Sequence, residues 1–243
     1  MITRRLALAA PLLMSACALV DLNKRVPLRA GQHAVQWPVP GLPEPVRMWL
    51  HLPRGYLESD RRWPLVVFLH GSGERGTDVE RVKFNGPPKL AASGTDYPFI
   101  LASPQLDEGW RWEALALHML LGSLQAGLRV DHARISATGL SLGGNGVWDW
   151  ATAYPRDLAA IAPICGFGEP DDMCRLAHLP VRAYHGDADT VVPLAAHQAC
   201  VDALRACGGR VEFIVFPGVG HGAWIPAYDD PALMPWLTAQ VRH

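Results

Sequence analysis

The sequence predicts an α/β domain with a mostly parallel central sheet and helices on both of its faces. Three observations indicate this fold. Strand-like apolar segments alternate with helix-like segments along most of the chain. Residues 64–70, PLVVFLH, form a continuous apolar run, as expected for a strand that is buried on both faces. The 243 residues suffice for one such domain with a sizeable core, and no linker divides them.

The expected elements follow one another in a regular order. Residues 31–53, rich in proline and glycine, are expected to form an antiparallel edge that contains a strand at 46–53. Further strands are expected at 64–70, 99–105, 134–141, 158–166, 181–186 and 211–218, and helices at 113–128, 143–155, 193–209 and 231–241. No insertion between residues 155 and 181 is long enough for a large lid domain.

The first residues have the pattern of an export signal. Two arginines precede an apolar run at residues 6–14, which is too short to span a membrane. Small residues then lead directly to Cys17, a pattern that resembles a bacterial lipobox. We therefore expect a lipoprotein signal peptide at 1–16, a tether at 17–30 that starts with lipidated Cys17, and the α/β domain at 31–243. The alternative is a plain cleaved signal with an incidental cysteine.

Charge and the signal together predict the location and exclude some partners. Ala18 follows Cys17 and is not an acidic inner-membrane retention signal, so we expect an exported protein anchored in the outer membrane and facing the periplasm. We expect the protein to contact the membrane only through this lipid anchor. The formal net charge is −1, so we expect no nucleic-acid partner.

Four other cysteines lie in the expected domain. Cys200 and Cys207 belong to one expected helix, where two turns separate them by about 10 Å, too far for a disulfide. Cys165 and Cys174 flank a loop-like stretch, and we expect them to pair in a compartment that permits disulfides. The spacing of cysteines and histidines predicts no metal site.

A serine between glycines marks the candidate nucleophile. Gly139-Leu-Ser141-Leu-Gly143 lies between an expected strand and an expected helix. This is the pattern of a nucleophile elbow, in which a sharp turn exposes the serine Oγ and glycines avoid clashes. The helix N-terminus behind the serine stabilises developing negative charge.

A serine nucleophile needs a base and an acid. The stretch YHGDADTVVP ends one later strand, and PGVGHGAW ends the next, so Asp187 or Asp189 and then His221 follow Ser141 in the order serine, acid, histidine. The carboxyl ends of parallel strands lie at one edge of the sheet, so we expect these side chains to meet there. Asp187 lies at the turn itself, where it suits bonds to backbone N–H groups, whereas Asp189 lies further along the loop.

Two backbone N–H groups are candidates for an oxyanion hole. In FLHGSGERG, the chain turns after a strand at His70-Gly71, and Ser72 is placed to donate its N–H. Leu142, directly after the nucleophile, supplies the second N–H. Ser72 is therefore expected to act through its backbone.

The same stretch also fits the dinucleotide-binding pattern Gly-x-Gly-x-x-Gly, which would indicate an NAD(P)-dependent oxidoreductase. The sequence argues against this class, because GPP at residues 86–88 interrupts the helix that should follow. The next strand ends in SPQ, without the acidic residue the pattern requires. A third class, a non-catalytic binding lipoprotein, is disfavoured by the complete set of serine, acid and histidine.

The ordered motifs resemble a known family. FLHGSGERGTD, NGPPKL, GLSLGGNGVWDWA, HGDADTVVP and GHGAW, spread over residues 46–236, resemble bacterial predicted peptidases and phospholipase/carboxylesterase-type serine esterases, dienelactone hydrolase-like members of the α/β-hydrolase superfamily. In that family the pattern His-Gly-x-x-Asp-x-x-Val-Pro carries its acid at the position of Asp189. The resemblance therefore implies carboxylic ester hydrolysis by Ser141, Asp189 and His221, through an acyl-enzyme and without a cofactor.

The resemblance leaves the substrate open. Its relatives include feruloyl esterases, acyl-thioesterases and polyhydroxybutyrate depolymerases, so a small-molecule ester is expected and a serine peptidase of the same fold is the alternative. Without a large lid, the pocket should be shallow and open. Trp110, Trp112 and Trp224 are candidates for its walls, with packing as the alternative role. For Glu74 and Arg75 we expect an ion pair that shapes the oxyanion loop.

Overall fold

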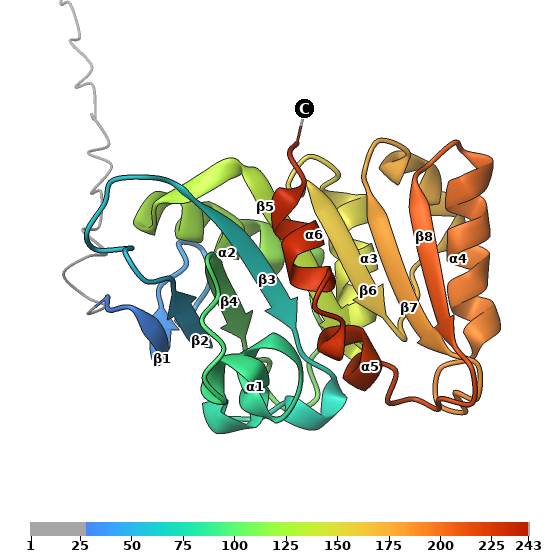
Figure 1. Cartoon of the computed structure of the whole chain (residues 1–243), viewed down its shortest axis with the longest axis horizontal. Helices are drawn as coiled ribbons and strands as arrows, with labels where there is room; N and C mark the ends of the chain where they lie inside the picture. The colour runs from blue at the N-terminus through green and yellow to red at the C-terminus, as the bar shows by residue number, and fades with distance from the viewer. Residues whose placement is uncertain (1–27, 243) are drawn as a thin grey trace, which may run out of the picture.

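The computed structural model describes residues 28–242, which build one eight-stranded sheet with the order β1-β2-β4-β3-β5-β6-β7-β8 (Figure 1). β1 and β2 pair antiparallel, as do β2 and β4, and the remaining neighbours are parallel. The strands are β1 (Gly31–Trp37), β2 (Val46–Leu52), β3 (Trp63–Leu69), β4 (Ile100–Pro104), β5 (Val130–Leu140), β6 (Ala160–Ile164), β7 (Val181–Gly186) and β8 (Val211–Phe216). The expected signal peptide and Cys17 lie outside the described residues.

Helices cover both faces of this sheet. In Figure 1, α1, α5 and α6 lie in front of the strands, and α2, α3 and α4 lie behind them. The α-helices are α1 (Gly86–Ala92), α2 (Ala114–Gly127), α3 (Leu142–Ala153), α4 (Leu194–Ala206), α5 (Trp224–Asp229) and α6 (Leu233–Ala239), and three 3-10 helices near the site are η2 (Ser72–Glu74), η3 (Val79–Phe84) and η4 (Pro170–Leu176). None of the helices in residues 28–242 has the length and apolar character needed to cross a membrane.

Strand β3 shows why the chain uses a continuous apolar run at its centre. Leu65, Val67 and Leu69 point into one core, shared with α2, α3 and α4, whereas Val66 and Phe68 point into the other, shared with α5 and α6. Because successive side chains of a strand point to opposite faces, a strand covered on both sides has no polar face.

The expected fold is confirmed, and its edge is antiparallel as predicted. The sequence missed the short helices α1 and α5 and the 3-10 helices. In particular, GPP at residues 86–88 does not interrupt a helix but starts one, because α1 carries proline at its first positions. Proline is tolerated there, since the first N–H groups of a helix have no intrahelical acceptor.

The expected disulfide between Cys165 and Cys174 is wrong. Cys174 lies on η4 and forms a disulfide with Cys207, directly after α4. η4 packs against α4, which brings two cysteines 33 residues apart together. Cys165 lies buried at the end of β6 and is free, as is Cys200. As expected, Cys200 and Cys207 do not pair.

Candidate active site

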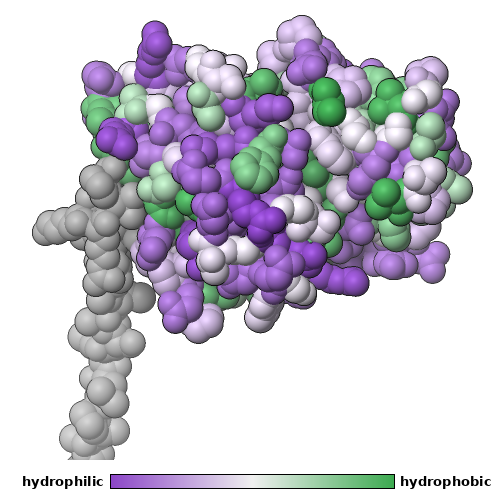
Figure 2. Space-filling model, turned by 90° about the horizontal axis from the view of Figure 1, so that it is seen from below, coloured by the Kyte–Doolittle hydropathy of each residue, from purple (hydrophilic) through white to green (hydrophobic). Residues whose placement is uncertain are grey.

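The candidate nucleophile, acid and base come together at the carboxyl edge of the parallel strands. Ser141 follows β5, Asp189 follows β7, and His221 follows β8. The arrowheads of these strands point to the lower side of Figure 1, and Figure 2 views the molecule from that side. That face carries many hydrophilic groups with hydrophobic groups between them.

Ser141 occupies a strained turn. Its φ of 52° lies in the left-handed region, which non-glycine residues rarely adopt. Glycines make the turn possible, because a Cβ at Gly143 would overlap the carbonyl oxygen of Leu69, and one at Gly139 would meet the backbone of Gly143. The turn leads directly into α3, so the positive end of that helix lies behind the serine.

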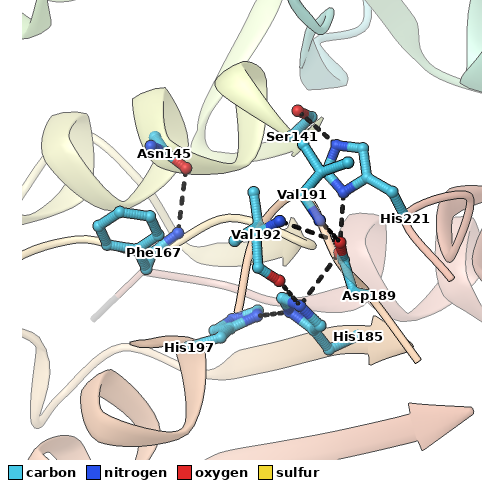
Figure 3. Close-up of polar contacts among 9 residues, drawn as sticks. All are labelled: Ser141, Asn145, Phe167, His185, Asp189, Val191, Val192, His197 and His221. Carbon is cyan, nitrogen blue, oxygen red and sulfur yellow. Dashed lines mark hydrogen bonds and ion pairs between the residues drawn. The ribbon is translucent and has the colours of Figure 1, made fainter. Parts of the chain in front are cut away.

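A continuous hydrogen-bonded chain joins the three side chains (Figure 3). His221 Nε2 lies 2.9 Å from Ser141 Oγ, and His221 Nδ1 lies 2.7 Å from Asp189 Oδ2. Since a carboxylate only accepts, Nδ1 carries the proton of the neutral ring and donates it to Asp189. Nε2 is then free to accept the proton of the serine hydroxyl, which is the arrangement a general base requires.

Asp189 is buried, yet its surroundings favour the charged form. Its side chain is 0 % exposed. Burial by itself raises the pKa of this carboxyl, but the hydrogen bonds from His221 and from the backbone N–H groups of Val191 and Val192 outweigh it, so the pKa lies below its usual range. The two N–H groups contact Oδ1 at 2.8 and 2.9 Å, which leaves Oδ2 for the imidazole.

A pair of buried histidines supports the acid loop. His185 Nε2 lies 2.9 Å from the carbonyl oxygen of Val192 and 3.3 Å from Asp189 Oδ2, and its Nδ1 lies 2.9 Å from Nδ1 of His197 (Figure 3). Burial lowers the pKa of both rings, that of His197 to about 3. Neutral rings explain the contacts, because His185 donates from Nε2 and accepts at Nδ1 from His197.

Asp187 has a different position from Asp189. It is exposed, and its Oδ1 accepts a hydrogen bond of 2.6 Å from the backbone N–H of Gly218, at the turn after β8. This contact joins the loops that carry the acid and the base. Asp189, and not Asp187, therefore contacts His221.

The two candidate oxyanion donors begin helical turns. Ser72 opens η2 and Leu142 opens α3, where the first N–H groups have no intrahelical acceptor. No hydrogen bond from either N–H to another protein group occurs within residues 28–242. Both groups are therefore free to bind a substrate oxygen.

His70 holds the candidate oxyanion loop in place. Its Nε2 accepts the backbone N–H of Leu106 at 3.0 Å, so Nδ1 carries the proton and donates to the carbonyl oxygen of Gly71 at 2.6 Å. Burial lowers the pKa of His70 to about 4. Trp112 is buried and donates its Nε1–H to the carbonyl oxygen of His70 at 3.0 Å. Trp112 is thus a packing residue and not a pocket wall, whereas Trp110 is 63 % exposed.

Glu74 lies buried beneath the same loop. The ion pair between Glu74 and Arg75 that the sequence suggested does not form. It accepts a hydrogen bond from Nδ2 of Asn85, whose Oδ1 accepts the Nε1–H of Trp224 at 3.0 Å. Arg75 instead lies 3.7 Å from Glu108 and donates to the carbonyl oxygen of Ser72. Asn85 was missed in the sequence, because its partners are 11 and 139 residues away.

Cys165 is a second residue that the sequence did not connect with the site. Its Sγ, a carboxylate oxygen of Asp189 and a ring nitrogen of His221 all lie within 4.8 Å of one another. Burial raises the pKa of this thiol to about 12, so it is protonated at neutral pH. The residues next to Cys165 in the sequence give no sign of this contact, because it forms only where the ends of β6 and β7 come together in the folded chain.

A separate cavity of about 790 Å³ lies near the amino ends of β3 and β4. Its lining includes Trp63, Phe99 and Tyr228, and none of Ser141, Asp189 and His221.

Comparisons with known proteins find similarity to hydrolases over part of the chain. Residues 113–230 match the model of the Dienelactone hydrolase family. A putative carboxymethylenebutenolidase of Methylorubrum extorquens is 30% identical over 125 residues, which are 46% of this chain and 43% of that protein. Poly(3-hydroxyalkanoate) depolymerase C of Paucimonas lemoignei is 28% identical over 141 residues, 51% of this chain and 32% of that protein. The chain thus spans less than half the length of these relatives.

Solved structures share the fold over most of the described chain. A thermostable esterase superposes with a TM-score of 0.76 at 29% identity and covers 87% of this chain and 63% of its own. A ferulic acid esterase superposes with a TM-score of 0.62 at 18% identity, covering 86% and 97%, which shows a common fold. The chain thus has the α/β-hydrolase fold, and its residues 113–230 are similar to the Dienelactone hydrolase family.

Proposed function

We propose that this protein hydrolyses carboxylic esters of small molecules, with Ser141 as nucleophile, His221 as general base and Asp189 as the acid that orients it. One observation carries the proposal: the chain of hydrogen bonds from Ser141 Oγ through His221 to Asp189, with distances of 2.9 and 2.7 Å. The esterase and carboxymethylenebutenolidase relatives support the same reaction class.

The proposed reaction has two steps. His221 takes the proton from Ser141 as Oγ attacks the ester carbonyl, and the N–H groups of Ser72 and Leu142 bind the oxyanion. His221 then gives this proton to the leaving alcohol, and an acyl-enzyme remains. Water repeats the sequence and releases the acid. Asp189 stabilises the protonated imidazole in both steps, consistent with its lowered pKa.

Exposed apolar side chains near the site support a substrate with an apolar group. Phe84 precedes Asn85, Val191 follows the acid by two residues, and Ile225 follows Trp224, and these three side chains are 58%, 67% and 60% exposed. Solvent-exposed apolar groups on the segments that flank the site suit an apolar acyl or alcohol part.

The test is hydrolysis of a panel of short acyl, aryl and cinnamoyl esters by the wild-type chain and by Ser141→Ala. Wild-type protein should hydrolyse members of the panel and react with a fluorophosphonate, and Ser141→Ala should do neither while its circular dichroism is unchanged. Peptide amides in the same panel test the alternative, a serine peptidase of this fold. Undiminished turnover by Ser141→Ala would exclude the proposed mechanism.

We further propose that the protein is exported and anchored in the outer membrane through lipidated Cys17. The disulfide between Cys174 and Cys207 supports export, because disulfides persist in oxidising compartments. Cys17→Ser should release the protein from the membrane fraction, and a variant that stays entirely with membranes would refute the anchor.

A further inference from the structure

The position of Cys165 is unusual in its backbone as well as in its neighbours. Cys165 and Ser141 are the two non-glycine residues with positive φ in residues 28–242, at 39° and 52°. They lie side by side, because the residues before them, Leu140 and Ile164, pair in register between β5 and β6. Such backbone strain destabilises the fold and clusters at functional sites. Glycine would avoid the strain, so a cysteine at this position suggests that its thiol has a function.

The surroundings of this thiol supply the ligand types that zinc prefers. Cys165 Sγ, an Asp189 carboxylate oxygen and a His221 ring nitrogen lie within 4.8 Å of one another. Zinc binds thiolate, imidazole and carboxylate at about 2.0–2.3 Å, which separates tetrahedral ligand atoms by roughly 3.3–3.7 Å. Shifts of about 1 Å therefore suffice to gather all three around one ion. The His221 side chain is 20 % exposed, which opens the site to solvent on that side.

We propose that Cys165, Asp189 and His221 form an inhibitory site for a thiophilic divalent cation such as Zn²⁺, with water in the fourth position. On binding, the Cys165 thiol releases its proton to solvent and the thiolate coordinates the ion. The imidazole stays neutral, with its proton on the nitrogen that does not bind the metal. The Asp189 carboxylate is already ionised and releases nothing.

A cation in this site blocks the proposed reaction through either nitrogen of His221. If Nε2 binds the ion, no lone pair remains to accept the Ser141 proton. If Nδ1 binds it, the hydrogen bond of 2.7 Å to Asp189 is replaced and the ring loses its orientation. The inhibition rests on the proposed ester hydrolysis, whereas the binding of the cation does not.

The binding test uses the full chain with Ser141→Ala, which keeps all three ligands and needs no turnover. After metal removal with a chelator, Co²⁺ should bind in one equivalent and give a thiolate-to-cobalt charge-transfer absorption that Zn²⁺ abolishes. Adding Cys165→Ser should remove this absorption, and Cys165→Ala serves where serine impairs folding. Cys200→Ser is the matched control, since Cys200 is the other free buried cysteine of the described chain. An absorption that is absent from Ser141→Ala, or that survives loss of Cys165, overturns the proposal.

The activity test compares inhibition of ester hydrolysis by Zn²⁺ in matched variants. Zn²⁺ should inhibit the wild-type chain and Cys200→Ser equally, and chelator should reverse it. Cys165→Ser should need at least about tenfold more Zn²⁺ for half-inhibition, since it lacks one ligand. Equal sensitivity of the Cys165 and Cys200 variants overturns the inhibitory role. If the wild-type chain hydrolyses no ester, the proposed function fails, and the cobalt absorption still decides the metal site.

Discussion

The indole of Trp224 stands perpendicular to the imidazole of His221, with ring centroids 5.4 Å apart. Trp224 also donates its Nε1–H to Asn85, which donates to the buried carboxylate of Glu74 beneath the oxyanion loop. A Cβ at Gly71 would lie 3.3 Å from Glu74 Oε2, so the carboxylate packs closely against that loop. One path of contacts thus joins the candidate base to the candidate oxyanion hole.

Asn85→Ala tests this path. The substitution leaves a buried carboxylate and an indole N–H without partners, each at a cost of about 1–3 kcal/mol in unfolding free energy. Turnover should fall by up to about 10²-fold, because both ends of the site lose their positions. Glu80→Gln, an exposed change in the preceding η3, is the control for kinetics and urea unfolding. Wild-type turnover and stability in Asn85→Ala would show that the path has no role.

The choice of acid is tested by Asp187→Asn and Asp189→Asn in parallel. Asp189→Asn should lower turnover by about 10⁴-fold, because the ring of His221 loses the carboxylate that orients it. Asp187→Asn weakens an exposed bond from Gly218, because a neutral amide oxygen replaces the carboxylate, and should cost at most about 1 kcal/mol of stability with turnover largely kept. Loss of turnover in Asp187→Asn together with its retention in Asp189→Asn would reverse the assignment.

The disulfide should stabilise the domain without taking part in catalysis. Cys174 and Cys207 are 33 residues apart in the sequence, and their disulfide closes the loop between them. For a loop of this length the chain-entropy model predicts that replacing both cysteines with serine lowers the unfolding free energy by about 3–4 kcal/mol. Urea unfolding of the double variant measures this loss, and ester hydrolysis in dilute buffer should be unchanged. Non-reducing peptide mapping that links Cys165 to Cys174 would contradict the pairing.

His70 should make stability depend on pH in a defined window. The neutral form is buried with a pKa of about 4, whereas the unfolded chain binds a proton near the ordinary value of about 6.5. The stability that this ring contributes is therefore present above pH 6.5 and is lost as the pH falls towards 4, by about 3 kcal/mol in total.

The measurement is urea unfolding of the wild type and His70→Asn at several pH values. The variant is expected to be less stable at pH 7, and its stability should fall less steeply between pH 6.5 and 4. Parallel curves for the two proteins across this window would contradict a neutral buried His70.

The sequence predicted the elements that depend on local pattern. Apolar runs such as that of residues 64–70 and the glycines around Ser141 carry their signal within a few residues. Strand ends then place Ser141, Asp189 and His221 at one edge, because parallel strands share a direction. Chain order therefore anticipated Ser141, His221 and an acid at Asp187 or Asp189, and the family resemblance favoured Asp189.

The remainder depends on contacts between segments far apart in the chain. The pairing of Cys174 with Cys207 requires η4 to pack on α4. The sequence instead favoured Cys165 as the partner of Cys174, because only a loop-like stretch separates these two cysteines. The links of Asn85 to Glu74 and Trp224 likewise form only in the folded chain. Side chains that join loops leave no periodic pattern, which is why they were missed.

The acyl-enzyme on Ser141 is the central claim, and mass spectrometry of quenched reactions tests it most directly. During hydrolysis of a slow aryl ester, intact protein should gain the mass of one acyl group, and peptide mapping should locate it on Ser141. Ser141→Ala should show no adduct under the same conditions. An adduct on another residue, or hydrolysis by the wild-type chain with no adduct and no loss in Ser141→Ala, would contradict the account.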